Sequence, residues 1–241
     1  MVGVVSRIRI LFLSACPLTT TRLALALDEE CAAIERELSM TPCRDDFEFR
    51  SKWAVSVDEM MRHLNEWEPT IIHFSGHGSP SPGLVTPGQD RAAPRPPLTR
   101  DVEGAGGAGG AGGAGGAGGP GIYLQEAHRS QYVSERALAQ MIASAAPSTR
   151  LVVLNACFTD TVAASLCHSV ECVVGINGLI GDAAACSFAV AFYRALGNRR
   201  SIGNAVAQAG ATLAAKHLTA EPHPVCRTRD GVSADQVFLA D

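Results

Sequence analysis

Short apolar runs bounded by turn residues recur along this chain and predict the strands of a sheet. Six such runs are present, at residues 8–14, 47–50, 70–75, 122–125, 151–156 and 172–176. The run at 151–156 is apolar at almost every position rather than at alternate ones. A continuous apolar pattern indicates a strand buried on both faces, as in a mostly parallel sheet.

Amphipathic segments between these runs predict helices. Over residues 21–40 an apolar stripe recurs at three- and four-residue steps, with Glu29, Glu30, Glu35 and Glu37 placed off it: Leu23, Leu27, Cys31, Ile34 and Leu38. A capping box formed by Ser56 and Glu59 predicts a second helix that begins at Val57. Further helices are expected after a cap at Ser134, over 183–196 and over 202–217.

The alternation of strands and helices predicts an α/β fold with a mostly parallel sheet and right-handed crossovers. The pattern disappears between residues 79 and 120, where Pro, Gly and Arg give way to a GGA repeat. This segment is far longer than a usual connection of a few residues. We therefore interpret 79–120 as a Pro/Gly-rich insertion into a single domain that spans residues 1–241.

Composition and charge exclude several functional classes. With 46% hydrophobic and 18% charged residues the chain is globular, and its net charge of −4 gives no electrostatic case for nucleic acid as a partner. No apolar stretch approaches the roughly 18 residues of a membrane span. The apolar run 10–15 before Cys16 is also shorter than the roughly 7 to 15 residues of a signal peptide, which disfavours a lipoprotein signal.

The cysteines favour a reducing compartment. The chain has eight of them, mostly within apolar runs and without CxxC pairs. Neither their placement nor their spacing suggests a disulfide framework. We therefore expect a cytoplasmic protein.

A histidine and a cysteine follow two of the predicted strands. His77 comes after the run 70–75, and Cys157 comes directly after the run 151–156. In parallel α/β sheets, ligands bind at the carboxyl ends of the strands. If these two strands are neighbours, the imidazole and the thiol lie on adjacent loops, as a thiol nucleophile and its base require.

The local sequence suits catalysis at this place. A helix expected to begin near Thr161 would lower the pKa of the Cys157 thiol through its N-terminus. His77 would accept the thiol proton and then protonate the leaving amine. The amides of Gly78 and Cys157 are placed to stabilise the tetrahedral oxyanion together.

Simpler interpretations of the same residues remain open. A cysteine at the end of a buried strand is most often a small core residue. His73 and His77 are four apart, as in zinc-binding helices, but they lie on a strand and its loop, so we expect no metal site. His73 itself is expected to be a core histidine that is hydrogen-bonded within the sheet.

Two segments of the chain resemble the signature of a known family. The segments IIHFSGHG at 71–78 and LVVLNAC at 151–157 resemble the two signature segments of the CHAT family of caspase-like cysteine peptidases. The stretches 173–176 and 188–196 are similar to the later strand and helix of that family. The resemblance covers nearly the whole chain apart from the insertion, which separates the His loop from the strand that usually follows it.

The resemblance implies a caspase-like three-layer α/β sandwich and a Cys-His dyad. His77 would be the base, Cys157 the nucleophile and Gly78 an oxyanion donor, with neither a metal nor an organic cofactor. The implied activity is the hydrolysis of peptide bonds in a protein substrate. Family members often act as bacterial effectors in defence or cell death, under the control of a sensor or adaptor protein.

Two aspartates are candidates for substrate specificity. Asp182 is expected to cap the helix that begins at Ala183, or alternatively to line the first specificity pocket, and Asp160 has the same two interpretations. A carboxylate in that pocket would favour Arg or Lys at the P1 position of the substrate through charge pairing.

Other functions share part of this pattern. The alternative from a different class is a catalytically silent scaffold that binds a partner, and a third is a Cys-His acyltransferase or deamidase. The insertion is interpreted as an inert tether, with a lid or an autoprocessing segment as the alternative. Candidate cut sites within it are Arg91, Arg95 and Arg100.

Overall fold

A six-stranded sheet forms the centre of the computed structural model, which describes residues 7–15, 21–80, 119–126, 129–218 and 223–240. Its strands in spatial order are β2 (Phe47–Lys52), β1 (Ile8–Ala15), β3 (Ile71–Gly76), β7 (Leu151–Asn155), β8 (Cys172–Asn177) and β9 (His223–Thr228). The strands from β2 to β8 pair in parallel, and only the edge strand β9 runs antiparallel to its neighbour in this sheet. The predicted mostly parallel sheet is confirmed.

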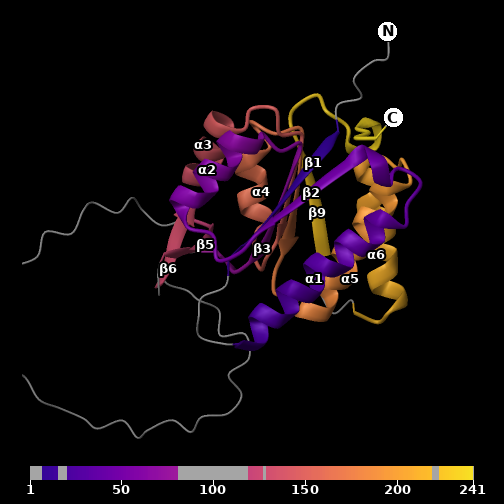
Figure 1. Cartoon of the computed structure of the whole chain (residues 1–241), viewed down its shortest axis with the longest axis horizontal. Helices are drawn as coiled ribbons and strands as arrows, with labels where there is room; N and C mark the ends of the chain where they lie inside the picture. The colour runs from indigo at the N-terminus through magenta and orange to yellow at the C-terminus, as the bar shows by residue number, and fades with distance from the viewer. Residues whose placement is uncertain (1–6, 16–20, 81–118, 127–128, 219–222, 241) are drawn as a thin grey trace, which may run out of the picture.

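Helices cover both faces of this sheet and give three layers (Figure 1). One face carries α1 (Thr21–Ser39), α5 (Asp182–Gly197) and α6 (Ile202–Ala215); the other carries α2 (Val57–Trp67), α3 (Glu135–Ala145) and α4 (Asp160–Leu166). Two short 3-10 helices, η1 (Arg44–Asp46) and η2 (Ala234–Gln236), complete the described elements. The predicted caspase-like sandwich is confirmed in its layers.

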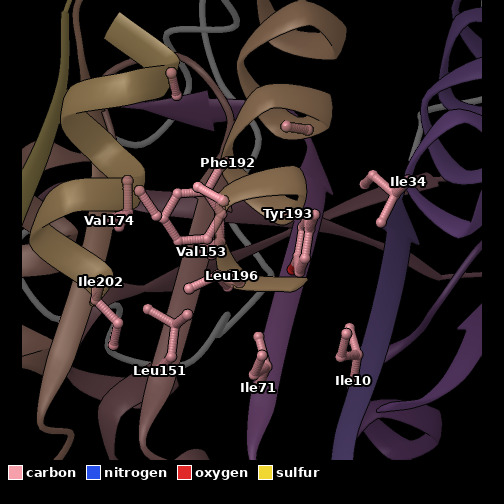
Figure 2. Packing of buried hydrophobic residues seen from close by; sticks show 14 of the residues in the cluster. Ile10, Ile34, Ile71, Leu151, Val153, Val174, Phe192, Tyr193, Leu196 and Ile202 are labelled. Atoms are coloured by element: carbon pink, nitrogen blue, oxygen red, sulfur yellow. The ribbon is translucent and has the colours of Figure 1, made fainter. Parts of the chain in front are cut away.

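The two faces of β1, β3, β7 and β8 enter separate apolar clusters, because successive side chains in a strand point to opposite sides. On β7, Val153 packs in the cluster with α5 and α6, whereas Val152 packs in the cluster with α2, α3 and α4. Figure 2 shows side chains of α5 lying over those of β3 and β7: Phe192, Tyr193, Leu196, Ile71 and Leu151. Each fully buried Leu, Ile or Phe contributes about 1.5 to 3 kcal/mol.

A second, antiparallel sheet lies beside the end of β3. It contains β4 (Gly78–Ser79), β5 (Gly121–Glu126) and β6 (Arg129–Ser134). Ser79, where the insertion is expected to begin, pairs directly with Gly121. The two ends of the predicted insertion are therefore paired neighbours in this sheet. The candidate cut sites Arg91, Arg95 and Arg100 lie outside the described residues.

The predicted helix starts are confirmed by their caps. The Ser56 side chain accepts a hydrogen bond from the amide of Glu59, and the Glu59 carboxylate accepts one from the amide of Ser56. Ser134 caps α3 through the amide of Ala137. None of the helices in the described part of the chain combines the length and hydropathy that a membrane crossing needs.

Candidate active site

The two strands predicted to carry the reactive side chains are neighbours in the sheet. β3 and β7 pair in parallel, with Ser75 opposite Asn155. His77 and Cys157 each follow two residues later, so both leave the sheet at the same edge and on adjacent loops. This is the juxtaposition that the sequence predicts, and both side chains are partly buried.

Gly78 packs directly against the backbone of Cys157. A Cβ atom at Gly78 would lie 2.1 Å from the carbonyl oxygen of Cys157 and 2.8 Å from Cγ2 of Thr159. Contacts this short cannot occur, so only glycine permits the two loops to approach so closely. The glycine therefore holds the loop of His77 against the loop of Cys157.

The pairing of β4 with β5 leaves the amide of Gly78 directed away from β5. The amide of Tyr123 donates to the carbonyl of His77 at 2.9 Å, and Gly78 lies opposite Ile122. In an antiparallel ladder this pattern makes Gly78 and Ile122 a non-hydrogen-bonded pair. The amide of Gly78 is thus not used by the small sheet, as an oxyanion donor requires.

The chain turns sharply after Cys157. Phe158 has a φ of 56°, in the left-handed region that a bulky residue rarely adopts. Thr159, which is 0% exposed, fixes the turn: its hydroxyl lies 2.9 Å from the carbonyl of Leu154 and accepts from the amide of Ile176 at 3.0 Å. Strained backbone held by such contacts is typical of functional sites.

The thiol of Cys157 is seated against the loop between β8 and α5. The amide of Ile180 donates to Sγ at 3.4 Å, and Sγ lies 3.8 Å from the carbonyl oxygen of Ile180. Burial raises the pKa of the Cys157 thiol above its ordinary value of 9.0, and the charge of Asp182 adds to this, although the Ile180 amide opposes it. The expectation of a thiol whose pKa is lowered by a helix N-terminus is therefore wrong, because desolvation outweighs the favourable backbone contacts.

His77 is also shifted toward its neutral form. Burial lowers the pKa of its imidazole from the ordinary value of 6.5, and the charge of Asp182 opposes this shift. In the described part of the chain no hydrogen bond joins His77 to Cys157. Catalytic hydrogen bonds are often long in the absence of substrate, and the groups rest here as a neutral imidazole and a neutral thiol.

The two candidate specificity aspartates have different surroundings. Asp182 is exposed, and it is close enough to His77 and Cys157 for its charge to raise the pKa of both. The expectation that Asp182 caps α5 is wrong, because α5 begins at Asp182 and its N-cap is the extended Gly181. The Asp160 carboxylate instead forms a bidentate pair with Arg227 of β9, at 2.8 and 2.9 Å.

His73 occupies the buried position that the sequence predicts. It is 0% exposed, and both ring nitrogens have partners: Nε2 lies 2.9 Å from Glu30 and Nδ1 lies 3.1 Å from the hydroxyl of Tyr193. Among the described residues, no group of three or more His, Cys, Asp or Glu side chains is arranged to hold a metal ion.

Glu30 is the main departure from the sequence prediction, which placed it on the polar side of α1. The side chain is buried and accepts hydrogen bonds from Ser75 and Asn155, on the two strands that carry the candidate dyad. Its spacing of three from Leu27 and four from Ile34 puts it on the apolar stripe. That spacing is the sequence signal for a buried carboxylate.

Comparisons with known proteins give one family and one fold. The family model described as the CHAT domain matches residues 11–225. A search of curated protein sequences gives no match. Among solved structures, a secreted C11 cysteine protease from Bacteroides thetaiotaomicron, in complex with an irreversible peptide inhibitor, is similar with a TM-score of 0.53 at 12% identity. The similarity covers 87% of this chain and 60% of the length of the protease, and at this identity it concerns the fold alone.

Proposed function

This chain belongs to the CHAT domain family, and we propose that it is a caspase-like cysteine endopeptidase with His77 and Cys157 as its dyad. The observation that carries the proposal is the meeting of these two residues on adjacent loops, with Gly78 packed against the carbonyl of Cys157. The pairing of β3 and β7 supports the proposal, because it puts the loop of Cys157 next to the loop of His77 and Gly78, although the two segments are far apart in the sequence.

The resting protonation states determine the proposed mechanism. Neutral His77 accepts the proton of the Cys157 thiol as Sγ attacks the substrate carbonyl carbon. The developing oxyanion is stabilised by the amides of Gly78 and Cys157. His77 then gives its proton to the leaving amine, and water activated by the same imidazole hydrolyses the thioester. Neither a metal nor an organic cofactor is part of this proposal.

The pKa shifts predict a wide pH range of activity. Activity needs neutral His77, whose pKa lies below 6.5, and the proton of the Cys157 thiol, whose pKa lies above 9.0. We expect the acidic half-maximum of kcat/KM to lie below pH 6.5 and the alkaline half-maximum to lie above pH 9.0, since this ratio reports the free enzyme. A thiolate absorbance near 240 nm that wild type shows at pH 7 and Cys157→Ala lacks would contradict the neutral resting pair.

We propose that Asp182 favours Arg or Lys at the P1 position of the substrate. Its carboxylate is exposed and close enough to both proposed dyad residues to raise their pKa values, so we expect it to meet a positive side chain of a bound peptide. Asp160 remains the second candidate, but its two oxygens are already bound by Arg227. A carboxylate with a bidentate Arg partner has less capacity to bind a substrate cation.

A library of fluorogenic peptides that vary at P1 tests this specificity. We expect Arg and Lys peptides to be cleaved best, and Asp182→Asn to lower kcat/KM for them by about tenfold, equivalent to about 1.4 kcal/mol. Asp160→Asn should leave the preference unchanged. Asp58→Asn, which alters an exposed aspartate in the first turn of α2, is the matched control. Best cleavage after acidic or purely apolar residues would reject a basic P1.

Regulation is part of the proposal. No hydrogen bond within the described residues joins the dyad, and burial holds the thiol protonated, so this arrangement suits an enzyme that a sensor or adaptor protein activates. We propose a regulated effector of bacterial defence or cell death, in the cytoplasm. The seven described cysteines are free thiols, which suits a reducing location. A purified chain that cleaves a protein substrate at full rate would argue against activation by a partner.

The competing functions differ in their products. An endopeptidase releases two peptides, an acyltransferase joins the acyl group to an amine, and a deamidase converts a side-chain amide to a carboxylate. A catalytically silent scaffold produces none of these changes. Mass spectrometry of substrate peptides incubated with the chain separates all four outcomes. The close packing of Gly78 on Cys157 favours the enzyme, because partner binding alone does not need it.

A further inference from the structure

One buried carboxylate in the described part of the chain contacts the two strands that lead to the candidate active site. Glu30, on α1, is 3% exposed. It accepts a hydrogen bond from the Ser75 hydroxyl at 2.8 Å and another from the Asn155 amide at 2.7 Å. Ser75 belongs to β3 and Asn155 to β7, so one side chain of α1 binds both strands.

These two contacts lie at the strand ends that lead to the dyad. Ser75 and Asn155 are opposite each other in the register of β3 and β7. His77 follows Ser75 by two residues, and Cys157 follows Asn155 by two residues. The carboxylate of Glu30 therefore fixes the last paired positions of both strands before the loops begin.

A third donor fixes the carboxylate itself. Nε2 of His73 lies 2.9 Å from Glu30, and Nδ1 lies 3.1 Å from the hydroxyl of Tyr193 on α5. Burial holds the pKa of Tyr193 well above its ordinary value, so its hydroxyl keeps its proton and donates to Nδ1. The His73 ring also stacks on Phe12 of β1 at 5.0 Å between centroids. The contacts extend from α1 across β3 to α5.

The energetics of burial do not by themselves explain a carboxylate in this core. Burying a charged group is unfavourable unless it is hydrogen-bonded, and apolar side chains of similar volume often stabilise a core equally well or better. Glu30 has its hydrogen bonds, yet the Oδ1 atom of Asn155 is buried among the described residues without a partner. Such a network makes geometry specific rather than maximising stability.

We propose that Glu30 is a positioning residue that holds the ends of β3 and β7 at the separation at which His77 can reach the Cys157 thiol, an inference that rests on the proposed peptidase function. Glu30 contacts neither dyad residue and acts through Ser75 and Asn155. Reacting groups must be held within a fraction of an ångström, and a displacement of about 1 Å can lower a rate by about 100-fold.

Kinetics of Glu30→Gln test the proposal, with a fluorogenic Arg-aminomethylcoumarin peptide as the substrate. Active sites are first titrated with a peptidyl chloromethyl ketone, so that kcat refers to folded enzyme. We expect kcat to fall by about 100-fold and KM to stay within about twofold. Ser75→Ala should lower kcat by about tenfold, and the double variant should be no slower than Glu30→Gln, because both changes act on one contact.

Two control variants separate positioning from charge and from stability. Glu29→Gln makes the same chemical change at the exposed neighbouring position on α1. Thr149→Val removes a buried hydrogen bond, from Thr149 to the Pro69 carbonyl at 2.8 Å, before the other end of β7. Both should keep the wild-type kcat, even where Thr149→Val lowers the melting temperature.

A second measurement requires no peptide cleavage. Iodoacetamide labelling of Cys157, followed by peptide mapping, should be several-fold slower at pH 7 in Glu30→Gln and Ser75→Ala, because an imidazole that no longer reaches the thiol cannot take its proton. Labelling and kcat equal to wild type in both variants would overturn the positioning role; if Glu30→Gln does not fold, Ser75→Ala decides. Wild type that cleaves no peptide would instead count against a peptidase that acts without an activating partner, and the labelling comparison would still decide the role of Glu30.

Discussion

Replacing Cys157 by alanine should lower kcat/KM for peptide hydrolysis by about 10⁴-fold or more, because the variant has no atom to form the thioester. His77→Ala should lower it by about 10³- to 10⁴-fold, since the neutral thiol then has no base. The double variant should be no slower than Cys157→Ala, because two groups that act in one step are not additive. Hydrolysis of a fluorogenic peptide measures all three.

Controls for this experiment come from the other free cysteines. Cys186 is partly buried, as Cys157 is, but it lies in α5. Cys186→Ala should retain wild-type activity within a factor of about two, because surface and partly buried changes away from a site usually alter stability only slightly. Activity that survives in Cys157→Ala would contradict the proposed dyad and indicate a different nucleophile.

Gly78→Ala should lower kcat by about 100-fold and destabilise the fold by about 1 to 3 kcal/mol, although it adds a single methyl group. The new Cβ would meet the Cys157 carbonyl oxygen at 2.1 Å, so one of the two loops must move. Any such movement separates the His77 loop from the nucleophile and displaces the proposed oxyanion donor. Chemical denaturation and peptide hydrolysis measure the two effects separately.

Gly210→Ala is the matched control for this substitution. Gly210 lies within α6, and a Cβ there would meet no atom within 4 Å. Alanine should stabilise the helix by up to about 1 kcal/mol and leave activity unchanged. Wild-type kinetics in Gly78→Ala would show that the close approach of the two loops has no part in catalysis.

The strands of the parallel sheet are predictable because their sequence pattern is strong. β7 and β8 are apolar at nearly every position, and burial on both faces requires this. β9 escapes prediction because its sequence, HPVCRT, mixes polar and apolar residues, and it forms an edge with one neighbour. β6 is likewise an edge strand, and it is mostly exposed and polar. Its composition does not indicate a strand, and only its pairing with β5 identifies it as one.

The candidate site is predictable in position but not in its electrostatics. Strand ends followed by His77 and Cys157 locate the pair, because parallel strands present their carboxyl ends at one edge. The pKa of Cys157 depends on how deeply the thiol lies and on the distant Ile180 amide, and local sequence encodes neither. Glu30 is missed for a related reason, since a charged residue is expected to face solvent until its partners on other strands are known.

The pairing of Ser79 with Gly121 has a practical meaning for the evolution and engineering of this chain. Two backbone positions that already face each other can be joined by almost any length of polypeptide, because closing a longer loop costs little additional entropy. This position can therefore accept new sequence, a reporter or an entire inserted module without any change in the order of the strands. Ser79 follows His77 by two residues, so any inserted sequence begins close along the chain to the candidate site.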